Sequence, residues 1–154
     1  MTKEKLLEEL KGFHTHHDNR LKTLEFAIKG IAGDVSTSCV KLADCALDKW
    51  LGERKDVLLK LFGDETIKRL NALHEEWHEE SEKVCHLANE HIHKHQSLIT
   101  KMFGKKIPKM AGAQKDRALA YYANLKDLTS QIDDTFNRMT KRLNALPKEM
   151  FTDE

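Results

Sequence analysis

Two histidines spaced four residues apart, His74 and His78, are the side chains in this sequence best suited to chemistry. In an α-helix this spacing places two rings one turn apart on the same face, so their nitrogens can converge on one metal ion about 2.0–2.1 Å from each. A helical projection puts both rings on, or at the edge of, an apolar face. The other members of that face are Ile67, Leu70, Trp77, Ser81, Cys85, Ala88, Ile92, Ile99 and Phe103. Two ordinary buried histidines are the alternative, and this segment alone leaves both interpretations open, although each buried ring must find partners for an N–H and a lone pair.

The other polar residues of this segment give weaker signals. His91 and His95 repeat the spacing but project away from His74 among polar neighbours, which favours a solvated face over an accessory metal site. His86 and His93 are predicted to point away from the core, and the sequence assigns no role to His91, His93 or His95. Four acidic residues are predicted to lie mostly on the solvent side, where they could still support the histidines as outer partners: Glu75, Glu76, Glu79 and Glu80.

The elements that must position these histidines are predicted to be helices. Two prolines and seven glycines among 154 residues are far too few turn-formers for a sheet protein of this length. The strongest breaks divide the chain into helical stretches of about 3–29, 34–62, 65–103 and 113–146, each with an apolar stripe. Short connections between four amphipathic helices predict an all-α fold, an antiparallel up-down four-helix bundle, forming a single domain over residues 1–154.

Local signals refine these helix boundaries. Asp34 and Ser36 are candidate N-caps for the second helix and Asp64 for the third, while Pro147 is predicted to end the fourth. The second stretch is the least regular and is expected to break near residues 50–52.

Charge and cysteine content argue against some classes of function and indicate a cellular compartment. Lys and Arg total 26 against 25 Asp and Glu, so no charge excess indicates a nucleic-acid or membrane surface. No apolar run reaches the roughly 20 residues of a membrane span, and the charged first residues do not resemble a secretory signal. An odd count of three cysteines then predicts reduced thiols in the cytoplasm. Cys85 is expected to be a small core residue, too far along its helix from His78 to share a metal, and Cys39 to be structural or exposed.

The two remaining ligands of a four-coordinate zinc site must come from other helices. The second stretch contains Cys45-Ala-Leu-Asp-Lys-Trp50, and the first contains His17 upstream of Leu24, Ala27, Ile28 and Gly30. This order, from His17 through Cys45 to the paired histidines, resembles the CZB family of chemoreceptor zinc-binding domains over about residues 14–88. Two positions depart from the family pattern: Arg20 stands where an aromatic residue is usual, and Asp48 where a glycine is usual.

The resemblance implies one Zn²⁺ ion held by His17, Cys45, His74 and His78, with His14 as the substitute if His17 is not the first ligand. Trp50 is expected to shield the site from water. The resemblance also implies a symmetric homodimer that senses zinc or oxidants and regulates a chemoreceptor or a diguanylate cyclase-like partner. The sequence contains no output domain of that kind, so the protein is expected to act in trans or to be part of something larger.

A filled tetrahedral site has no open position for a reactive water, so we expect a regulatory protein rather than an enzyme. Two other classes stay open. A hemerythrin-like di-iron or oxygen-binding bundle would need inward carboxylates and histidines on several helices, yet the fourth predicted helix has no histidine. A metal-free helical interaction module is the other alternative.

Overall fold

The computed structural model describes residues 1–30, 39–102 and 109–151, without the side chains of 95–102. Within these ranges every regular element is a helix, which confirms the predicted all-α class. The elements are α1 (Lys3–Ile28), η1 (Leu42–Asp44), α2 (Ala46–Glu53), α3 (Lys55–Phe62), α4 (Asp64–Met102), α5 (Gly112–Ala145) and η2 (Lys148–Met150), where η marks a short 3₁₀ helix. None of the described helices is long and apolar enough to cross a membrane.

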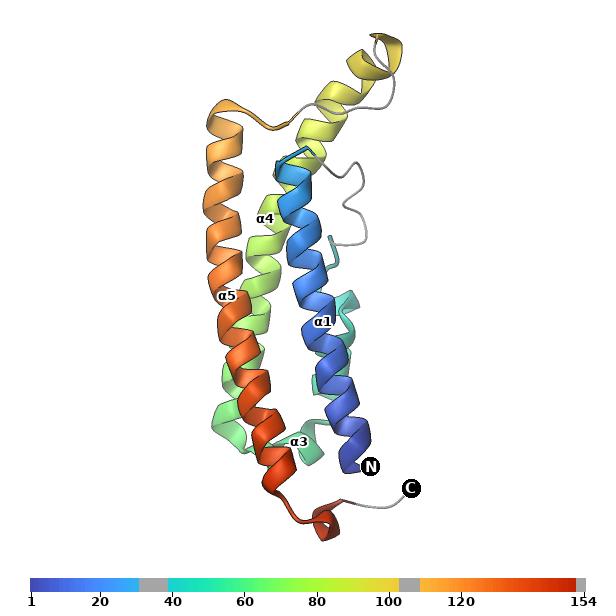
Figure 1. The fold of residues 1–154 in the computed structure, drawn as a ribbon, viewed down its shortest axis with the longest axis vertical. Coiled ribbons are helices and arrows are strands. Elements are labelled where there is room, and N and C mark those ends of the chain that lie inside the picture. The colour runs from blue at the N-terminus through green and yellow to red at the C-terminus, as the bar shows by residue number, and fades with distance from the viewer. Residues whose placement is uncertain (31–38, 103–108, 152–154) are drawn as a thin grey trace.

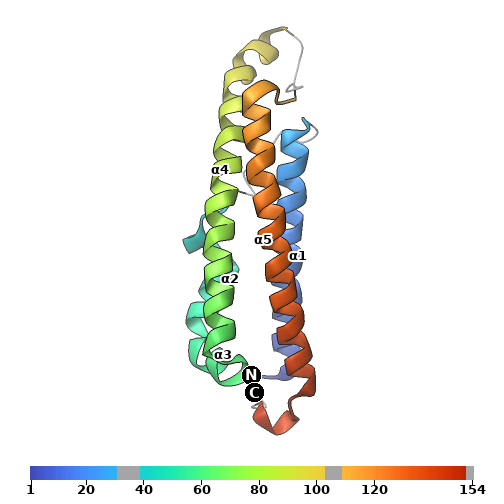
Figure 2. The ribbon, with the colours of Figure 1, turned by 90° about the vertical axis from the view of Figure 1, so that its left-hand side faces the viewer.

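Three long helices lie side by side along the long axis of the molecule (Figures 1 and 2). α1 and α4 run in the same direction, and α5 returns in the opposite direction. The short helices α2 and α3 lie beside the half of α1 that carries the N-terminus. The two short helices and the irregular segment before them therefore lie where a fourth long helix would complete a four-helix bundle.

The second predicted stretch, 34–62, contains the expected break, but the break occurs at Arg54 rather than at residues 50–52, and in its described part the first α-helix begins only at Ala46. Lys41 and Cys45 have extended backbones on either side of η1, and Arg54, between α2 and α3, has a φ of −109° and a ψ of 15° that are not helical. Arg54 falls where a continuous apolar stripe through Leu47, Leu51 and Leu58 would need an apolar residue. Its guanidinium instead approaches Glu9 on α1 at 3.4 Å. The proposed caps at positions 34 and 36 lie outside the described residues.

Glycine sets the two sharpest helix ends. Gly30 (φ 73°) follows α1, and Gly63 (φ 85°) joins α3 directly to α4 in a conformation that residues with a Cβ rarely adopt. Asp64 is the first residue of α4 and pairs with Lys68 at 2.6 Å, so it acts in the first turn rather than as the predicted cap. α5 ends at Ala145, just before Pro147, as predicted.

The core lies between the three long helices and the short pair. Its largest fully buried side chains include Trp77 on α4 and Phe136 on α5. The stripe predicted for the last helix is confirmed from Leu125 to Leu143, and Leu146 packs against it only partly buried. Each buried side chain of this size contributes roughly 1.5–3 kcal/mol, so the core holds α1, α4 and α5 in fixed register around whatever polar groups lie between them.

Candidate metal centre

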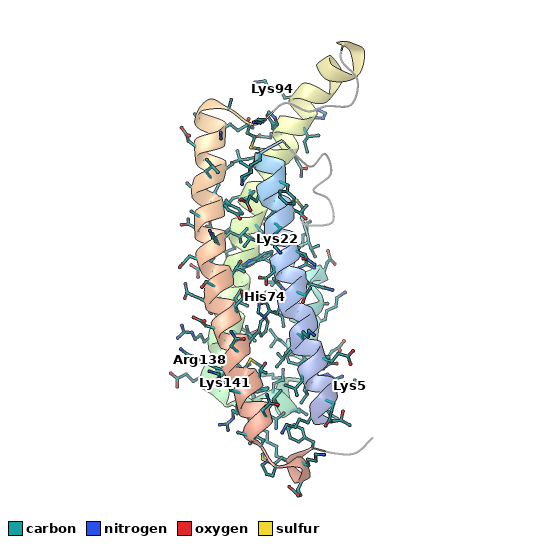
Figure 3. All side chains as sticks on the ribbon, in the orientation of Figure 1. Lys5, Lys22, His74, Lys94, Arg138 and Lys141 are labelled. Carbon is teal, nitrogen blue, oxygen red and sulfur yellow. A yellow bond between two sulfur atoms is a disulfide. The ribbon has the colours of Figure 1, made fainter. Side chains whose placement is uncertain are left out.

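His17, Cys45, His74 and His78 come together in the interior of the helical core, although they are far apart in the sequence. Their four candidate ligand atoms all lie within 4.8 Å of one another, and no side chain of the four is more than 2% exposed. Figure 3 shows His74 in the interior, between the ribbons of the long helices. Buried polar groups at this density require partners, so the cluster is the strongest candidate site in the described part of the chain.

Three elements supply the four side chains. α4 carries His74 and His78 one turn apart, α1 carries His17, and Cys45 lies at the N-cap position of α2. Because α2 begins only at Ala46, the backbone at Cys45 is still extended, with φ −74° and ψ 130°. The late start of α2 therefore places the thiol at the beginning of a helix that faces α1 and α4.

The spacing of the donor atoms matches a tetrahedral zinc site. The Nε2 atoms of His74 and His78 are 3.1 Å apart, and the Cys45 Sγ lies 3.4 Å from Nε2 of His74 and 3.9 Å from Nε2 of His17. Zinc–nitrogen bonds of about 2.0–2.1 Å and a zinc–sulfur bond of about 2.3 Å give tetrahedral edges of roughly 3.3 Å between nitrogens and roughly 3.6 Å between nitrogen and sulfur. The residues present thus fit such an ion.

Backbone carbonyl groups fix two of the three imidazole tautomers. Nδ1–H of His17 donates to the carbonyl oxygen of Phe13 at 2.9 Å, and Nδ1–H of His78 donates to that of Val40 at 2.9 Å. With the proton held on Nδ1, each Nε2 presents a lone pair to the centre of the cluster. This outer hydrogen bonding is the usual way in which metal-ligating histidines are oriented.

The electrostatics of the cluster favour a thiolate at Cys45 and the neutral form of His74. Burial raises the pKa of Cys45, but contacts with the three histidines and with Arg20 outweigh it and bring that pKa to about 2. Burial is also the main reason that the pKa of His74 is lowered. Arg20 Nη1 lies 3.5 Å from the sulfur, so the residue that departs from the CZB pattern contacts the thiol. The cluster is electron-rich and suited to a cation.

The aromatic residue against the histidines is Trp77. Its ring centroid is 4.8 Å from that of His17 and 5.1 Å from that of His78, both nearly edge-on. Its Nε1–H donates to Thr129 on α5 at 2.8 Å, so α5 supports the site through this indole. A helical projection of this segment places Trp77 on the same face as His74. That position is the feature of the sequence that indicates an indole packed against the clustered histidines. Trp50, the expected shield, packs against Phe13 and donates to Glu9 at 2.7 Å.

His14 belongs to a different polar group between α1 and α5. Its Nε2 is 3.1 Å from Asp18 Oδ2 and 3.1 Å from Asp133 Oδ1, and all three side chains are partly exposed. Burial, opposed by His14 and reinforced by Asp18, raises the pKa of Asp133 to about 6. The structure therefore brings His17, and not His14, to the other three predicted ligands.

The histidines farther along α4 include both exposed and buried side chains. As predicted, His86 and His93 are exposed, His86 in a 3.2 Å pair with Glu90. The solvated face predicted for His91 is wrong, because its ring is only 5% exposed. The start of α5 covers this part of α4, where Gln114 donates to the carbonyl oxygen of Leu87. The His95 side chain lies outside the described set.

Of the acidic residues near the paired histidines, Glu75, Glu76 and Glu79 are exposed as predicted. Glu80 differs, because its side chain is only 13% exposed, bonds to Lys83 at 2.6 Å and accepts from Asn124 of α5 at 3.5 Å.

The prediction of three reduced cysteines is wrong. Cys39 and Cys85 form a disulfide with their Cα atoms 5.8 Å apart, and Cys45 is the free cysteine. The chain approaching α2 passes along α4, and this brings together two residues separated by 46 positions. Helical periodicity places Cys85 on an inward face but cannot show which irregular segment packs there.

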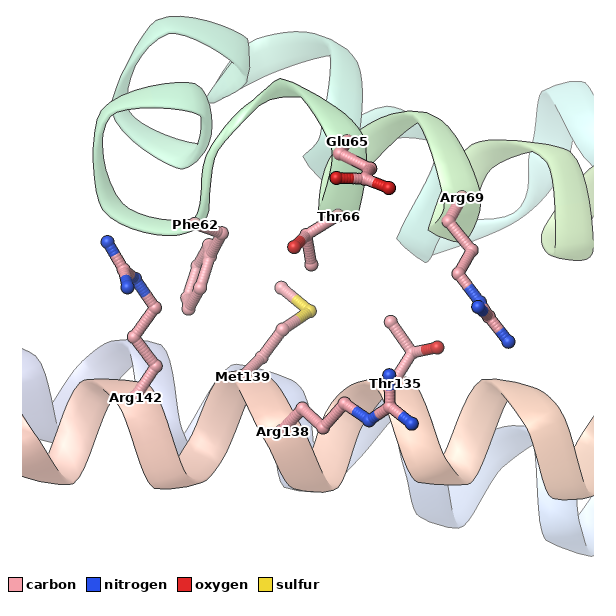
Figure 4. Close-up of a pocket in the computed structure, with 8 residues that line it drawn as sticks. All are labelled: Phe62, Glu65, Thr66, Arg69, Thr135, Arg138, Met139 and Arg142. Carbon is pink, nitrogen blue, oxygen red and sulfur yellow. The ribbon is translucent and has the colours of Figure 1, made fainter.

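A surface cleft lies elsewhere, between the start of α4 and the end of α5 (Figure 4). Its volume is about 330 Å³, and Phe62 and Met139 form its apolar floor beside Arg69, Arg138 and Arg142. None of the four clustered residues lines it. The candidate metal centre is thus a buried interior cluster and not the floor of this cleft.

Comparison with protein-family models, curated proteins and solved structures finds no match to this chain. The case for the site rests on its own residues and geometry.

Proposed function

We propose that this chain binds one zinc ion through His17, Cys45, His74 and His78 and acts as a zinc-responsive regulatory protein rather than an enzyme. The observation that carries the proposal is the set of four buried donor atoms at tetrahedral spacing, with the Nδ1 protons of His17 and His78 bonded to backbone carbonyl groups. Three imidazoles and a thiolate suit zinc, whereas a di-iron site would require carboxylate ligands within the cluster. The four ligands would fill the coordination shell and leave no position for a reactive water.

The likeness of this ligand order to the CZB family supports the finer parts of the proposal. In it, α2 and α3 together serve as the second helix of an antiparallel up-down four-helix bundle. The protein would be a cytoplasmic homodimer that regulates a chemoreceptor or a diguanylate cyclase-like partner. Because the site ties α1, α2 and α4 together, gain or loss of zinc would shift their relative positions, and a partner would read that shift.

Elemental analysis of untagged protein tests the zinc proposal. We expect close to one zinc per chain, with most of the metal lost in Cys45→Ser and in His78→Ala. His86→Ala is the matched control, since His86 is an exposed histidine on the same helix, and it should keep full zinc content. Iron in place of zinc, or equal zinc in all four proteins, would contradict the assignment.

A further inference from the structure

The Cys39–Cys85 disulfide lies next to the hydrogen bond that orients one of the clustered histidines. Cys39 directly precedes Val40, whose carbonyl oxygen accepts the Nδ1–H of His78 at 2.9 Å. Cys85 is two turns beyond His78 on α4. One covalent bond therefore holds the segment that begins at Cys39 against the helix that carries His74 and His78.

We propose that the Cys39–Cys85 pair is a reversible redox clamp that controls how tightly the cluster retains zinc. This inference rests on the proposed function, since it assigns the regulation of that same site. In the oxidised protein the disulfide holds Val40 at α4, the carbonyl accepts from His78, and the ring keeps its Nε2 lone pair on the metal. In the reduced protein only non-covalent contacts hold Val40 there.

The expected change in zinc affinity follows from the hydrogen bond that reduction weakens, the one from His78 to the Val40 carbonyl oxygen. Loss of an outer hydrogen bond to a metal-ligating histidine typically lowers metal affinity roughly 10–100-fold. The same segment continues into Lys41 and η1 and reaches Cys45 at the start of α2. Reduction thus loosens the approach to two of the four ligands, the imidazole of His78 and the thiolate of Cys45.

The redox step is a thiol–disulfide exchange with a low-molecular-weight disulfide such as oxidised glutathione. The thiolate of Cys39, which is the partly exposed partner, attacks one sulfur of glutathione disulfide and releases one glutathione thiolate. Cys85 then attacks the mixed disulfide at the Cys39 sulfur and releases the second glutathione. The protein dithiol loses two electrons and two protons, and two reduced glutathione molecules form. Zinc is not oxidised or reduced.

Cys45 is the wrong cysteine for this exchange. It is 1% exposed, and its sulfur is surrounded by imidazole nitrogens and the Arg20 guanidinium. Zinc would occupy its lone pairs and protect it further. The chain therefore separates the metal-binding thiolate of Cys45 from a redox pair that is not part of the four-residue cluster.

The test is the rate at which zinc-loaded full-length protein releases zinc to a colorimetric chelator. We compare protein equilibrated with oxidised glutathione and protein treated with a phosphine reductant, with the disulfide verified by mass spectrometry. The reduced wild type should release zinc on the order of tenfold faster. Cys39→Ser and Cys85→Ala should release zinc at the fast rate under both conditions, and His86→Ala should behave as wild type.

A second readout is the His78 Nδ1–H proton observed by NMR, which should exchange with water faster in the reduced protein. Equal release rates in the two verified redox states, or failure of oxidised glutathione to form the disulfide, would overturn the clamp while leaving the zinc site intact. Protein that holds no zinc in either state would contradict the proposed function and, with it, the clamp on zinc retention.

Discussion

Arg20 is the residue whose contact with the thiol was least expected, since it stands where the CZB pattern has an aromatic residue. Its Nη1 lies 3.5 Å from Cys45 Sγ and helps to lower the pKa of that thiol. We expect Arg20→Gln to raise the pKa of Cys45 in metal-free protein by roughly one pH unit, because a nearby cation that favours the thiolate is removed. Thiolate ultraviolet absorbance measured against pH reports the change. Lys22→Gln, an exposed cation on the same helix, should leave the titration unchanged.

Asp133 makes a second prediction at the residue scale. Burial raises its pKa to about 6, from an ordinary value of 3.8. Between these pH values the folded protein holds a proton that the unfolded chain has lost, so this group lowers stability as pH rises from about 4 to about 6. Asp133→Asn should therefore be more stable than wild type at pH 7.5, by about 1 kcal/mol, and should lose that advantage at pH 4. Thermal melts at the two pH values measure the difference; a variant less stable at pH 7.5 would contradict the assignment.

Of the candidate ligands, residue spacing alone indicates only that the pair on α4 lies on one inward face, because helix geometry fixes where positions four apart lie; it does not distinguish two metal ligands from two buried histidines. His17 and Cys45 needed the family likeness, since no periodicity relates residues on different helices. The contacts of Arg20 and the Cys39–Cys85 bond depend on how the segment before α2 packs on α4. Neither local propensity nor hydrophobic period contains that information.

Among the elements, α5 supports the site from behind through Thr129. The Thr129 hydroxyl accepts from Trp77 Nε1–H at 2.8 Å and donates to the carbonyl oxygen of Leu125 at 2.8 Å. Thr129→Val keeps the shape but leaves the buried indole N–H without its acceptor, which should cost about 1–3 kcal/mol of unfolding free energy. Urea unfolding measures this loss. Thr23→Val is the matched control, because Thr23 makes the same local bond to the carbonyl oxygen of Asn19 on α1. Equal losses of unfolding free energy in the two variants would contradict the supporting role of Thr129.

The long helices were predictable and the short ones were not, for a physical reason. α1, α4 and α5 carry unbroken apolar stripes over many turns. Where the structure describes both a helix end and the residue beyond it, the end lies within one residue of its predicted position. α2 and α3 interrupt their stripe at Arg54, where the ion pair with Glu9 replaces an apolar contact. The segment before Cys45 is held in place by the disulfide from Cys39 to Cys85 on α4. No helical periodicity in the sequence indicates that bond.

For the whole molecule, metal removal should lower stability because the cluster exists only in the folded chain. Zinc present at about a hundred times its dissociation constant stabilises a folded protein by about 2.7 kcal/mol. For a chain of this size that corresponds to a Tm change of roughly 5–10 °C. Differential scanning calorimetry with and without a chelator should show this decrease, and added zinc should restore the Tm. Cys45→Ser should show little response to either treatment, whereas His86→Ala should respond as wild type does.

X-ray absorption at the zinc edge of the purified, untagged protein measures whether one zinc ion is held by three histidines and one cysteine. We expect a four-coordinate ion with one sulfur at about 2.3 Å and three imidazole nitrogens at about 2.0–2.1 Å, and loss of the sulfur scattering in any zinc retained by Cys45→Ser. A zinc environment made only of nitrogen and oxygen, or a site that holds two irons, would contradict it.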